Sequence, residues 1–170
     1  MKIRPLSPAA PDEVSFRQAE ASDEGRIREL FIEMLCSING TPDEKGYDEG
    51  YLDKFFAGRE DRIFVAERGS EVIAYLSVEV YRDGGYIYLD DLSVTESCRS
   101  RGIGTALINI AEVYAKEIGI PAIVFHVNRS NARAHSLYLR LGYSDNEDQG
   151  SRMRMAKDIG TSNHGGGNAV

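Results

Sequence analysis

Apolar residues recur at helical spacing in the first part of the chain. The first such segment follows Ser22, a good N-cap residue, and starts with Asp23 and Glu24, whose charges suit the positive end of a helix dipole. Its apolar face consists of Ile27, Leu30, Phe31, Met34, Leu35 and Ile38. A second segment, over about 48–57, has an apolar side made of Tyr51, Leu52, Phe55 and Phe56. The spacing predicts two helices, the first ending next to Gly40.

Beyond residue 60 the pattern changes to that of strands. Three runs rich in Ile, Val, Tyr and Phe cover 62–68, 71–81 and 86–94. The turns between them are short and contain glycine, which favours antiparallel hairpins. A further short strand is expected at 15–20, ahead of the first helix.

The rest of the chain alternates between helices and strands. A helix over 102–118 is followed by Gly119 and Pro121, which suit a helix end because proline cannot continue the helix. The remaining expected elements are a strand over 122–127, a helix over 131–141 and strands over 143–146 and 152–157. This order predicts an α/β fold, with helices on the faces of a mixed sheet.

Length and composition favour one domain. The chain has 170 residues, of which 42% are hydrophobic, and this suffices for one compact core. We expect the domain over 15–158, after a loose lead-in over 1–14 that contains three prolines. The segment 159–170 is rich in Gly and Asn and has no periodicity, so we expect a disordered tail.

Charge and cysteine content narrow the range of partners. Twenty basic and 27 acidic residues give a net charge of −7, whereas a general nucleic-acid binder presents a basic face. We expect neither a membrane span nor a signal peptide, because no apolar run is long enough and the N-terminus leads into prolines. Cys36 and Cys98 have no metal-ligand spacing and are typical of a reducing compartment. These features predict a cytoplasmic protein that binds no nucleic acid, membrane or metal.

A basic, glycine-containing loop joins the strand at 86–94 to the helix at 102–118. It consists of Arg99, Ser100, Arg101, Gly102, Ile103, Gly104 and Thr105. The first turn of a helix presents unpaired N–H groups, and glycine lets that backbone approach a phosphate closely. The loop is therefore a candidate pyrophosphate site. The alternative is that the glycines only allow the helix to pack on the sheet.

Two common nucleotide loops do not fit this segment. A dinucleotide loop, G-x-G-x-x-G/A, needs a small residue where Leu107 stands, and an acidic residue at the end of the strand 122–127. A P-loop needs Gly-Lys-Ser/Thr, which the segment lacks. The remaining candidate ligand of this loop is a diphosphate of another kind, and coenzyme A carries one.

Three motifs in order resemble the GNAT N-acetyltransferase superfamily. The run R-S-R-G-I-G over 99–104 resembles its Q/R-x-x-G-x-G/A motif, and Y-L-D-D-L-S-V over 88–94 resembles its central strand. The segment 131–143 resembles its second signature, an Asn before a helix that bears a Tyr and is followed by Leu-Gly-aromatic. The resemblance spans about 14–157. It implies the GNAT fold, with a mixed, mostly antiparallel central sheet flanked by helices, and an acetyl-CoA-dependent N-acetyltransferase.

The resemblance also implies where acetyl-CoA binds, as co-substrate and without a metal. The pantetheine arm would lie between the central strand and the next one, paired with backbone groups of Leu92, Ser93 and Val94. The amides of the loop from Arg101 to Thr105 would hold the pyrophosphate. Asn131 would bind the pantetheine arm, directly or through water.

In this family an amine attacks the thioester directly, and the resemblance assigns the acid that this step needs to Tyr138. A base must also take a proton from the amine. Asp90 is the first choice, because polyamine-acetylating relatives carry a Glu there; Glu79 and a water chain are the alternatives. Asp91 and Glu79 would bind a cationic substrate. Neighbouring strand residues face opposite sides, so only one of the two aspartates lines the cleft unless the strand bulges.

The acceptor region, formed by the first two helices and their loop, is acidic and aromatic. Such groups suit a primary amine on a small cationic molecule or a peptide. Acetyl and longer acyl groups remain alternatives for the group transferred. The second hypothesis is a non-catalytic acyl-CoA-binding or sensor domain on the same fold, and the presence of both Tyr138 and Asp90 favours the enzyme. Dimers are common in the family, so a homodimer is compatible with the resemblance.

Overall fold

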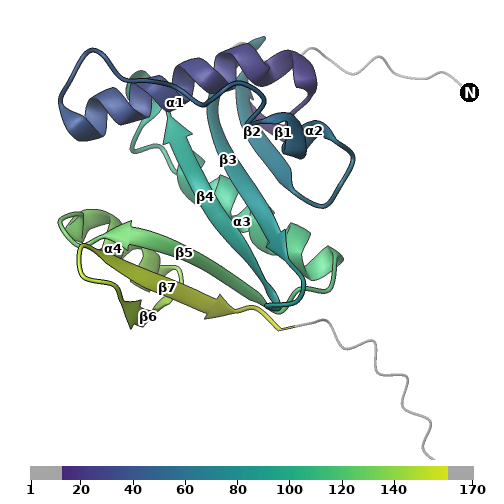
Figure 1. Ribbon diagram of the computed structural model, residues 1–170, viewed down its shortest axis with the longest axis vertical. Coiled ribbons are helices and arrows are strands. Elements are labelled where there is room, and N and C mark those ends of the chain that lie inside the picture. Colours follow the sequence, from purple (N-terminus) through teal and green to yellow (C-terminus); the bar gives the residue numbers. More distant parts are fainter. Residues whose placement is uncertain (1–12, 161–170) are drawn as a thin grey trace, which may run out of the picture.

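The computed structural model describes residues 13–160 as a seven-stranded sheet with flanking helices (Figure 1). The strands are β1 (Val14–Gln18), β2 (Arg62–Arg68), β3 (Glu71–Tyr81), β4 (Tyr86–Val94), β5 (Ala122–Asn128), β6 (Ser144–Asp148) and β7 (Arg152–Asp158). The helices are α1 (Glu24–Asn39), α2 (Asp53–Phe56), α3 (Ile103–Glu117) and α4 (Ala132–Arg140), with 3₁₀ turns η1 (Ala21–Asp23) and η2 (Glu96–Cys98). Most of the predicted lead-in and tail lies outside the described residues.

The strand order across the sheet is β1-β2-β3-β4-β5-β7-β6. Every neighbouring pair is antiparallel except β4 and β5, which run parallel. These two strands pair over only Tyr86–Tyr88 and Ala122–Val124, and then diverge (Figure 1). The predicted mixed, mostly antiparallel sheet is confirmed, and it is split along its length between β4 and β5.

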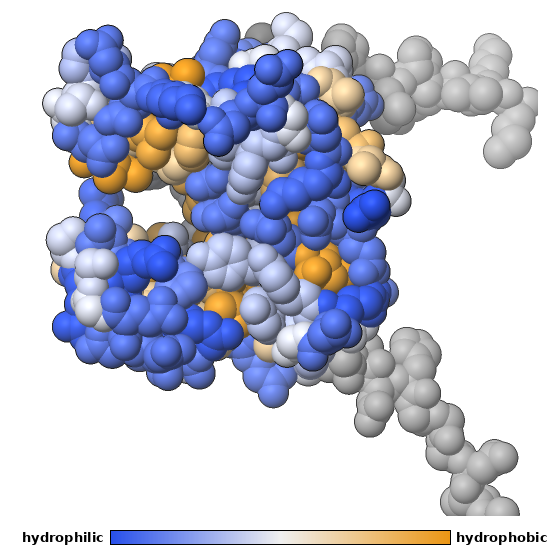
Figure 2. Space-filling model, viewed as in Figure 1, coloured by the Kyte–Doolittle hydropathy of each residue, from blue (hydrophilic) through white to orange (hydrophobic). Residues whose placement is uncertain are grey.

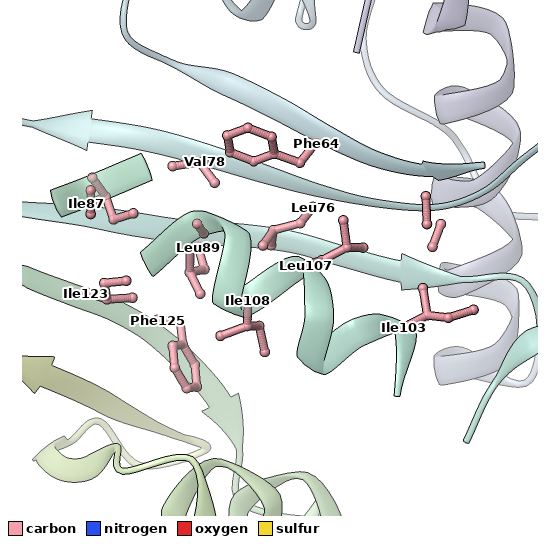
Figure 3. Packing of buried hydrophobic residues seen from close by; sticks show 14 of the residues in the cluster. Phe64, Leu76, Val78, Ile87, Leu89, Ile103, Leu107, Ile108, Ile123 and Phe125 are labelled. Carbon is pink, nitrogen blue, oxygen red and sulfur yellow. The ribbon is translucent and has the colours of Figure 1, made fainter. Parts of the chain in front are cut away.

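Alternation along the strands gives the sheet two buried faces. In β2, Ile63 and Val65 belong to a cluster with the apolar side of α1, whereas Phe64 and Ala66 belong to the cluster around α3. Leu107 and Ile108 of α3 lie against the strands in that second cluster (Figure 3). The helices α1 and α3 therefore cover opposite faces, and both fix the position of β4.

The structure corrects three of the predicted element boundaries. The first strand begins at Val14, which pairs with Arg68, and Ser22 lies inside a 3₁₀ turn instead of capping α1. The turn is held by Asp23, whose carboxylate accepts the backbone N–H of Glu20 (2.8 Å).

The second predicted helix is much shorter than its pattern suggested, because α2 begins only at Asp53. The segment before α2 runs through turns, and Gly50 adopts a positive φ of 74° that a helix does not allow. The apolar residues Tyr51 and Leu52 therefore lie in a turn instead of in a helix. None of the helices in the described part of the chain is long and apolar enough to span a membrane.

Candidate functional site

The split between β4 and β5 leaves unpaired backbone on both strands. Beyond Tyr88, β4 keeps its pairing with β3 through Leu92, Ser93 and Val94, but within residues 13–160 no strand pairs with its other edge. In the same part of the chain, β5 beyond Val124 pairs with β7 alone. Backbone groups that face the split are therefore available to an extended ligand, since a strand edge is a template for added pairing. The space-filling view is hollowed on this side, between the surface over α1 and the surface over α4 (Figure 2).

The start of α3 lies at the wide end of the split and has no capping side chain. Its N-cap is Gly102, with a positive φ of 78°, and no acidic residue stands in the first turn. Ser100, two residues earlier, also has a positive φ, of 61°. Alternation of left-handed and right-handed residues turns successive N–H groups toward one concavity, which is a common anion-binding geometry. The helix start therefore presents N–H groups that nothing else in the described chain caps.

A cleft of about 520 Å³ opens in front of this helix start. Of the residues predicted to bind the cofactor, those that line it are Val94, Arg99, Ser100, Gly102, Ile103, Gly104, Thr105 and Asn131. Arg101, the second arginine of this basic loop, is not among the lining residues. Leu92 lies deeper, in the split itself, and Ser93 is buried, with its hydroxyl donating to the carbonyl of Leu30 (2.9 Å).

The charge of the cleft comes from three arginines and no acidic residue. Arg99, Arg133 and Arg140 line it, in a chain whose net charge is −7. Arg133 and Arg140 were not predicted. Their spacing places them on the same face of α4 as Leu137, which also lines the cleft, and this spacing was the signal available in the sequence.

Arg99 also ties the cleft to α1. Its Nε donates to the carbonyl of Val94 (2.9 Å), and its guanidinium reaches Ser37 (3.3 Å) and Glu33 (4.0 Å) on α1. The carbonyl of Val94, which was predicted to pair with the pantetheine arm, therefore already accepts a hydrogen bond from the protein. Asn131 caps α4 through its side-chain oxygen, which accepts the N–H of Ala134 (3.1 Å), so its amide NH₂ is the part left to contact a ligand.

Gly104 is not required by the structure around it. A methyl group at this position would meet only Leu92, at 3.5 Å, which is an ordinary contact, and the backbone conformation is accessible to any residue. The alternative explanation, that this glycine only allows tight packing of the helix, therefore loses its basis. An open, uncapped backbone at this point fits a bound phosphate.

A small cavity of about 40 Å³ lies in the split and brings together the two predicted catalytic residues. Asp90 from β4 and Tyr138 from α4 both line it, together with Phe125 of β5. The ring of Tyr138 packs against that of Phe125, 4.4 Å between centroids, and burial raises the pKa of Tyr138. The phenol therefore stays protonated at neutral pH and can donate a proton.

A bulge in β4 allows both aspartates to line the same hollow, although they are neighbours on a strand. Leu92 pairs with Leu76 and Leu89 pairs with Val78, so Asp90 and Asp91 both stand opposite Ser77. The hydroxyl of Ser77 accepts the N–H of Asp91 (2.9 Å) and so replaces the missing strand partner. Both aspartates line one hollow as a result, which strict alternation would forbid.

The two carboxylates accept hydrogen bonds from tyrosines, and neither forms an ion pair within residues 13–160. Tyr51 donates to Asp90 (3.2 Å) and Tyr47 donates to Asp91 (2.6 Å). Desolvation, followed by the charges of Asp91 and Glu79, raises the pKa of Asp90 to about 6, although part of the residue is exposed. Desolvation also raises the pKa of Asp91, against the hydrogen bond from Tyr47. An Asp90 carboxyl in this state is suited to exchange a proton near neutral pH.

Glu79, the alternative base, is engaged elsewhere. Its carboxylate forms an ion pair with Lys54 of α2 (2.9 Å), and it does not line the small cavity. His126 of β5, which was not predicted, does line that cavity. Its Nδ1 lies 2.7 Å from the hydroxyl of Tyr88, its buried Nε2 has no hydrogen-bond partner in the described chain, and burial lowers its pKa.

A third hollow, of about 410 Å³, opens on the α1 side of the split. Asp90 lines both this hollow and the small cavity, so it stands at their junction. The outer wall is an aromatic stack of Phe31, Tyr47 and Tyr51, with centroids 3.8 and 4.9 Å apart. Phe31, Tyr47, Asp48 and Tyr51 of the predicted acceptor region line this hollow, and its other two carboxylates, Asp90 and Asp91, come from β4.

Comparisons with known proteins agree with this geometry. Residues 30–143 match the family described as Acetyltransferase (GNAT) family. An uncharacterized N-acetyltransferase, YhfO of Bacillus subtilis, is 29% identical over 137 residues, which are 78% of this chain and 91% of that protein. The fold is similar to that of the PaiA N-acetyltransferase from Thermoplasma acidophilum in complex with coenzyme A, with a TM-score of 0.71, 18% identity and coverage of 86% and 99% of the two chains. It is also similar to YncA, a putative acetyltransferase from Salmonella typhimurium with its cofactor acetyl-CoA, with a TM-score of 0.72, 18% identity and coverage of 94% and 100%.

Proposed function

Because the chain belongs to the acetyltransferase (GNAT) family, we propose that it transfers the acetyl group of acetyl-CoA to a primary amine on a small cationic molecule or a peptide. One observation carries the proposal: Asp90 and Tyr138 line one small cavity at the split in the sheet. A base and an acid on the two sides of a reacting thioester are what acyl transfer to an amine needs.

The cleft at the start of α3 supports a binding site for the coenzyme. The uncapped N–H groups from Arg101 to Thr105 would bind the pyrophosphate, helped by the dipole of a 15-residue helix. Arg99, Arg133 and Arg140 would add charge around the phosphates. The free edges of β4 and β5, with Asn131 beyond them, would bind the pantetheine arm and direct its thioester toward Tyr138.

The acceptor would enter from the hollow beside α1, where Asp90 takes a proton from its ammonium group. The amine nitrogen then attacks the thioester carbonyl carbon, so that a C–N bond forms and the C–S bond breaks. The attacking nitrogen loses its second proton to solvent as it becomes the amide. Tyr138 gives its hydroxyl proton to the departing thiolate and regains a proton from the same solvent, so the protons balance. Neutral His126 is the second group at this cavity able to take the proton of the amine.

The proposal is tested by incubating the protein with acetyl-CoA and a panel of primary amines. We expect thiol release that requires both the protein and an amine, with an acetylated amine detected by mass spectrometry. Coenzyme A binding without acetylation of any amine would contradict it and would favour the non-catalytic acyl-CoA-binding domain. A panel of acyl-CoA donors of increasing chain length would show whether acetyl is the preferred group.

A further inference from the structure

A polar stripe on α1 holds the chain at the point where β4 ends (Figure 1). The stripe consists of the carbonyl of Leu30 and the side chains of Glu33 and Ser37, which share one side of the helix because they are three and four residues apart. The carbonyl of Leu30 accepts the hydroxyl of Ser93 (2.9 Å), and Ser37 lies 3.3 Å from the guanidinium of Arg99. The helix therefore contacts both the last residues of β4 and the loop that leads to α3.

Glu33 is the central residue of this stripe. Its carboxylate accepts the backbone N–H of Glu96 (2.8 Å) and the hydroxyl of Thr95 (3.1 and 3.2 Å to the two oxygens). It also lies 4.0 Å from the guanidinium of Arg99, which lines the coenzyme cleft, whereas Glu33 does not. We infer that Glu33 is a positioning residue for the coenzyme, because its hydrogen bonds fix the segment from Thr95 to Arg99 ahead of α3. The role rests on the proposed function, since it takes the start of α3 as the pyrophosphate site.

The 3₁₀ turn η2 obtains its cap from Glu33. Thr95, the N-cap residue of η2, makes no capping hydrogen bond with its own side chain, and the first N–H groups of such a turn have no partner within it. The carboxylate of Glu33 accepts one of them, that of Glu96, across a separation of 63 residues. A side-chain oxygen in this place stabilises the turn as an N-cap does. A residue of α1 therefore does the work of a local cap.

The position of η2 determines that of the coenzyme loop. Cys98, the last residue of η2, is buried, so one side of the turn is fixed by the core and the other by Glu33. The chain then runs through Ser100 directly to Gly102, the N-cap of α3. A segment this short passes a displacement of η2 on to the amides at the start of α3. Hydrogen bonds weaken steeply with distance and angle, so such a displacement should weaken the binding of a phosphate.

The same helix also forms a wall of the hollow beside α1. Phe31 and Leu35 line that hollow. Glu33 and Ser37 contact the segment ahead of α3 instead. Residues two positions apart do not share a helix face, so α1 serves the two sites with different sides. A substitution on the acceptor helix should therefore change the affinity for the coenzyme, although Glu33 lies outside the coenzyme cleft.

The test measures the affinity of coenzyme A for three variants of α1. Glu33→Ala removes the acceptor of both hydrogen bonds, and isothermal titration should show binding weaker by about tenfold, or about 1.4 kcal/mol. Glu33→Gln keeps a carbonyl oxygen in this place, so its Kd should stay within about threefold of the wild-type value. Glu29→Ala is the matched control, since Glu29 is exposed and pairs with Arg26 of the same helix (3.0 Å). The Kd of this control should equal that of the wild-type protein.

A merely structural role of Glu33 would give a different result. Glu33→Ala would then have a lower Tm, but would bind coenzyme A with the wild-type Kd wherever circular dichroism shows it folded, and this would overturn the inference. A Glu33→Gln variant that binds as weakly as Glu33→Ala would contradict it as well, because the charge and not the hydrogen bonds would then matter. If Glu33→Ala does not fold, Thr95→Val removes the hydroxyl bond alone and should weaken binding by about threefold. An unchanged Kd for Thr95→Val would then overturn the inference.

Turnover separates this inference from the proposed function. If an amine is acetylated but Glu33→Ala binds coenzyme A like the wild-type protein, the proposed function stands and the positioning role is wrong. If no amine is acetylated although the Kd values follow the expected order, the proposed function fails and the role of Glu33 stands. If both are right, Glu33→Ala should raise KM for acetyl-CoA with little change in kcat, because Asp90 and Tyr138 are unchanged.

Discussion

Asp90 and Asp91 are neighbours in the sequence, and each accepts a hydrogen bond from a different tyrosine. Residue types and motif position were enough to predict both as site residues. The sequence did not decide which of them faces the cleft, because strand alternation allows one and a bulge allows both. The buried hydroxyl of Ser77, which binds the amide of Asp91, is the tertiary contact that decides it.

Replacement of Asp90 should change the pH profile of activity. As a base, Asp90 acts when ionised, so kcat/KM of the wild-type protein should fall as the pH drops through about 6. Asp90→Asn should lower kcat/KM by about 100-fold or more and remove this acid limb, as measured by thiol release across pH. An acid limb that persists in the variant would assign the proton transfer to His126 or to water.

The same variant should be more stable than the wild-type protein at high pH. The pKa of Asp90 is about 6 in the folded protein against a model value of 3.8, so the folded state binds this proton more tightly than the unfolded state. The stability contributed by Asp90 therefore falls as the pH rises through this window. Asp90→Asn should have the higher Tm at about pH 8, with a smaller difference at about pH 5. A Tm difference that does not vary with pH would contradict the raised pKa.

Tyr138→Phe should separate chemistry from binding. Loss of the acid should lower kcat by about 100-fold, with little change in the Kd of coenzyme A. Tyr143→Phe is the matched control, because its ring packs in the same aromatic group but its hydroxyl binds Glu112 (2.9 Å). Tyr143→Phe should lower the stability of the protein and leave kcat unchanged. Equal kcat values for Tyr138→Phe and the wild-type protein would show that Tyr138 is not the acid.

At the scale of elements, β2, β3 and β4 were predicted with the boundaries that the structure has, since alternation and glycine turns mark them clearly. The helix predicted at 48–57 was wrong in its first half, because Gly50 turns the chain and Tyr51 is covered by stacking on Tyr47 instead of by the packing of a helix. A periodic pattern of apolar residues indicates which side chains are buried, but it does not show whether a helix or a turn carries them. The split between β4 and β5 followed from the family resemblance alone.

The bulge in β4 should depend on Ser77. Ser77→Ala leaves the amide of Asp91 without its acceptor, and an unpaired buried N–H costs about 1–3 kcal/mol. Urea denaturation should show this loss of stability. Activity of the folded variant should fall because both aspartates shift, while its affinity for coenzyme A is kept. Unchanged turnover at full saturation would mean that the bulge does not position the acceptor site.

At the scale of the whole molecule, the coenzyme cleft combines segments that are distant in the sequence. Arg99 precedes α3, whereas Arg133 and Arg140 belong to α4, and the parallel pairing of β4 with β5 brings the two segments together. The motif predicted the backbone of the loop, which depends on local sequence. It did not predict the arginines of α4, since their charge reaches the cleft only through the tertiary arrangement.

Because the two halves of the sheet pair over a short stretch, coenzyme A should act as a link between them. Hydrogen–deuterium exchange should slow on binding at the free edge of β4 and at the start of α3, and the Tm should rise. A ligand at about 100 times its Kd adds about 2.7 kcal/mol to stability. Protection confined to other regions would contradict the cleft as the binding site.

The most direct test of the account is the affinity of coenzyme A for two variants of Gly104. Gly104→Ala adds a methyl group that the fold accommodates, 3.5 Å from Leu92, and Gly104→Glu adds a carboxylate at the predicted pyrophosphate position. Isothermal titration should show a modest loss for Gly104→Ala and a loss of about 100-fold or more for Gly104→Glu, with both variants folded by circular dichroism. A folded Gly104→Glu variant that binds coenzyme A as tightly as the wild-type protein would contradict the central claim that the start of α3 holds the phosphates.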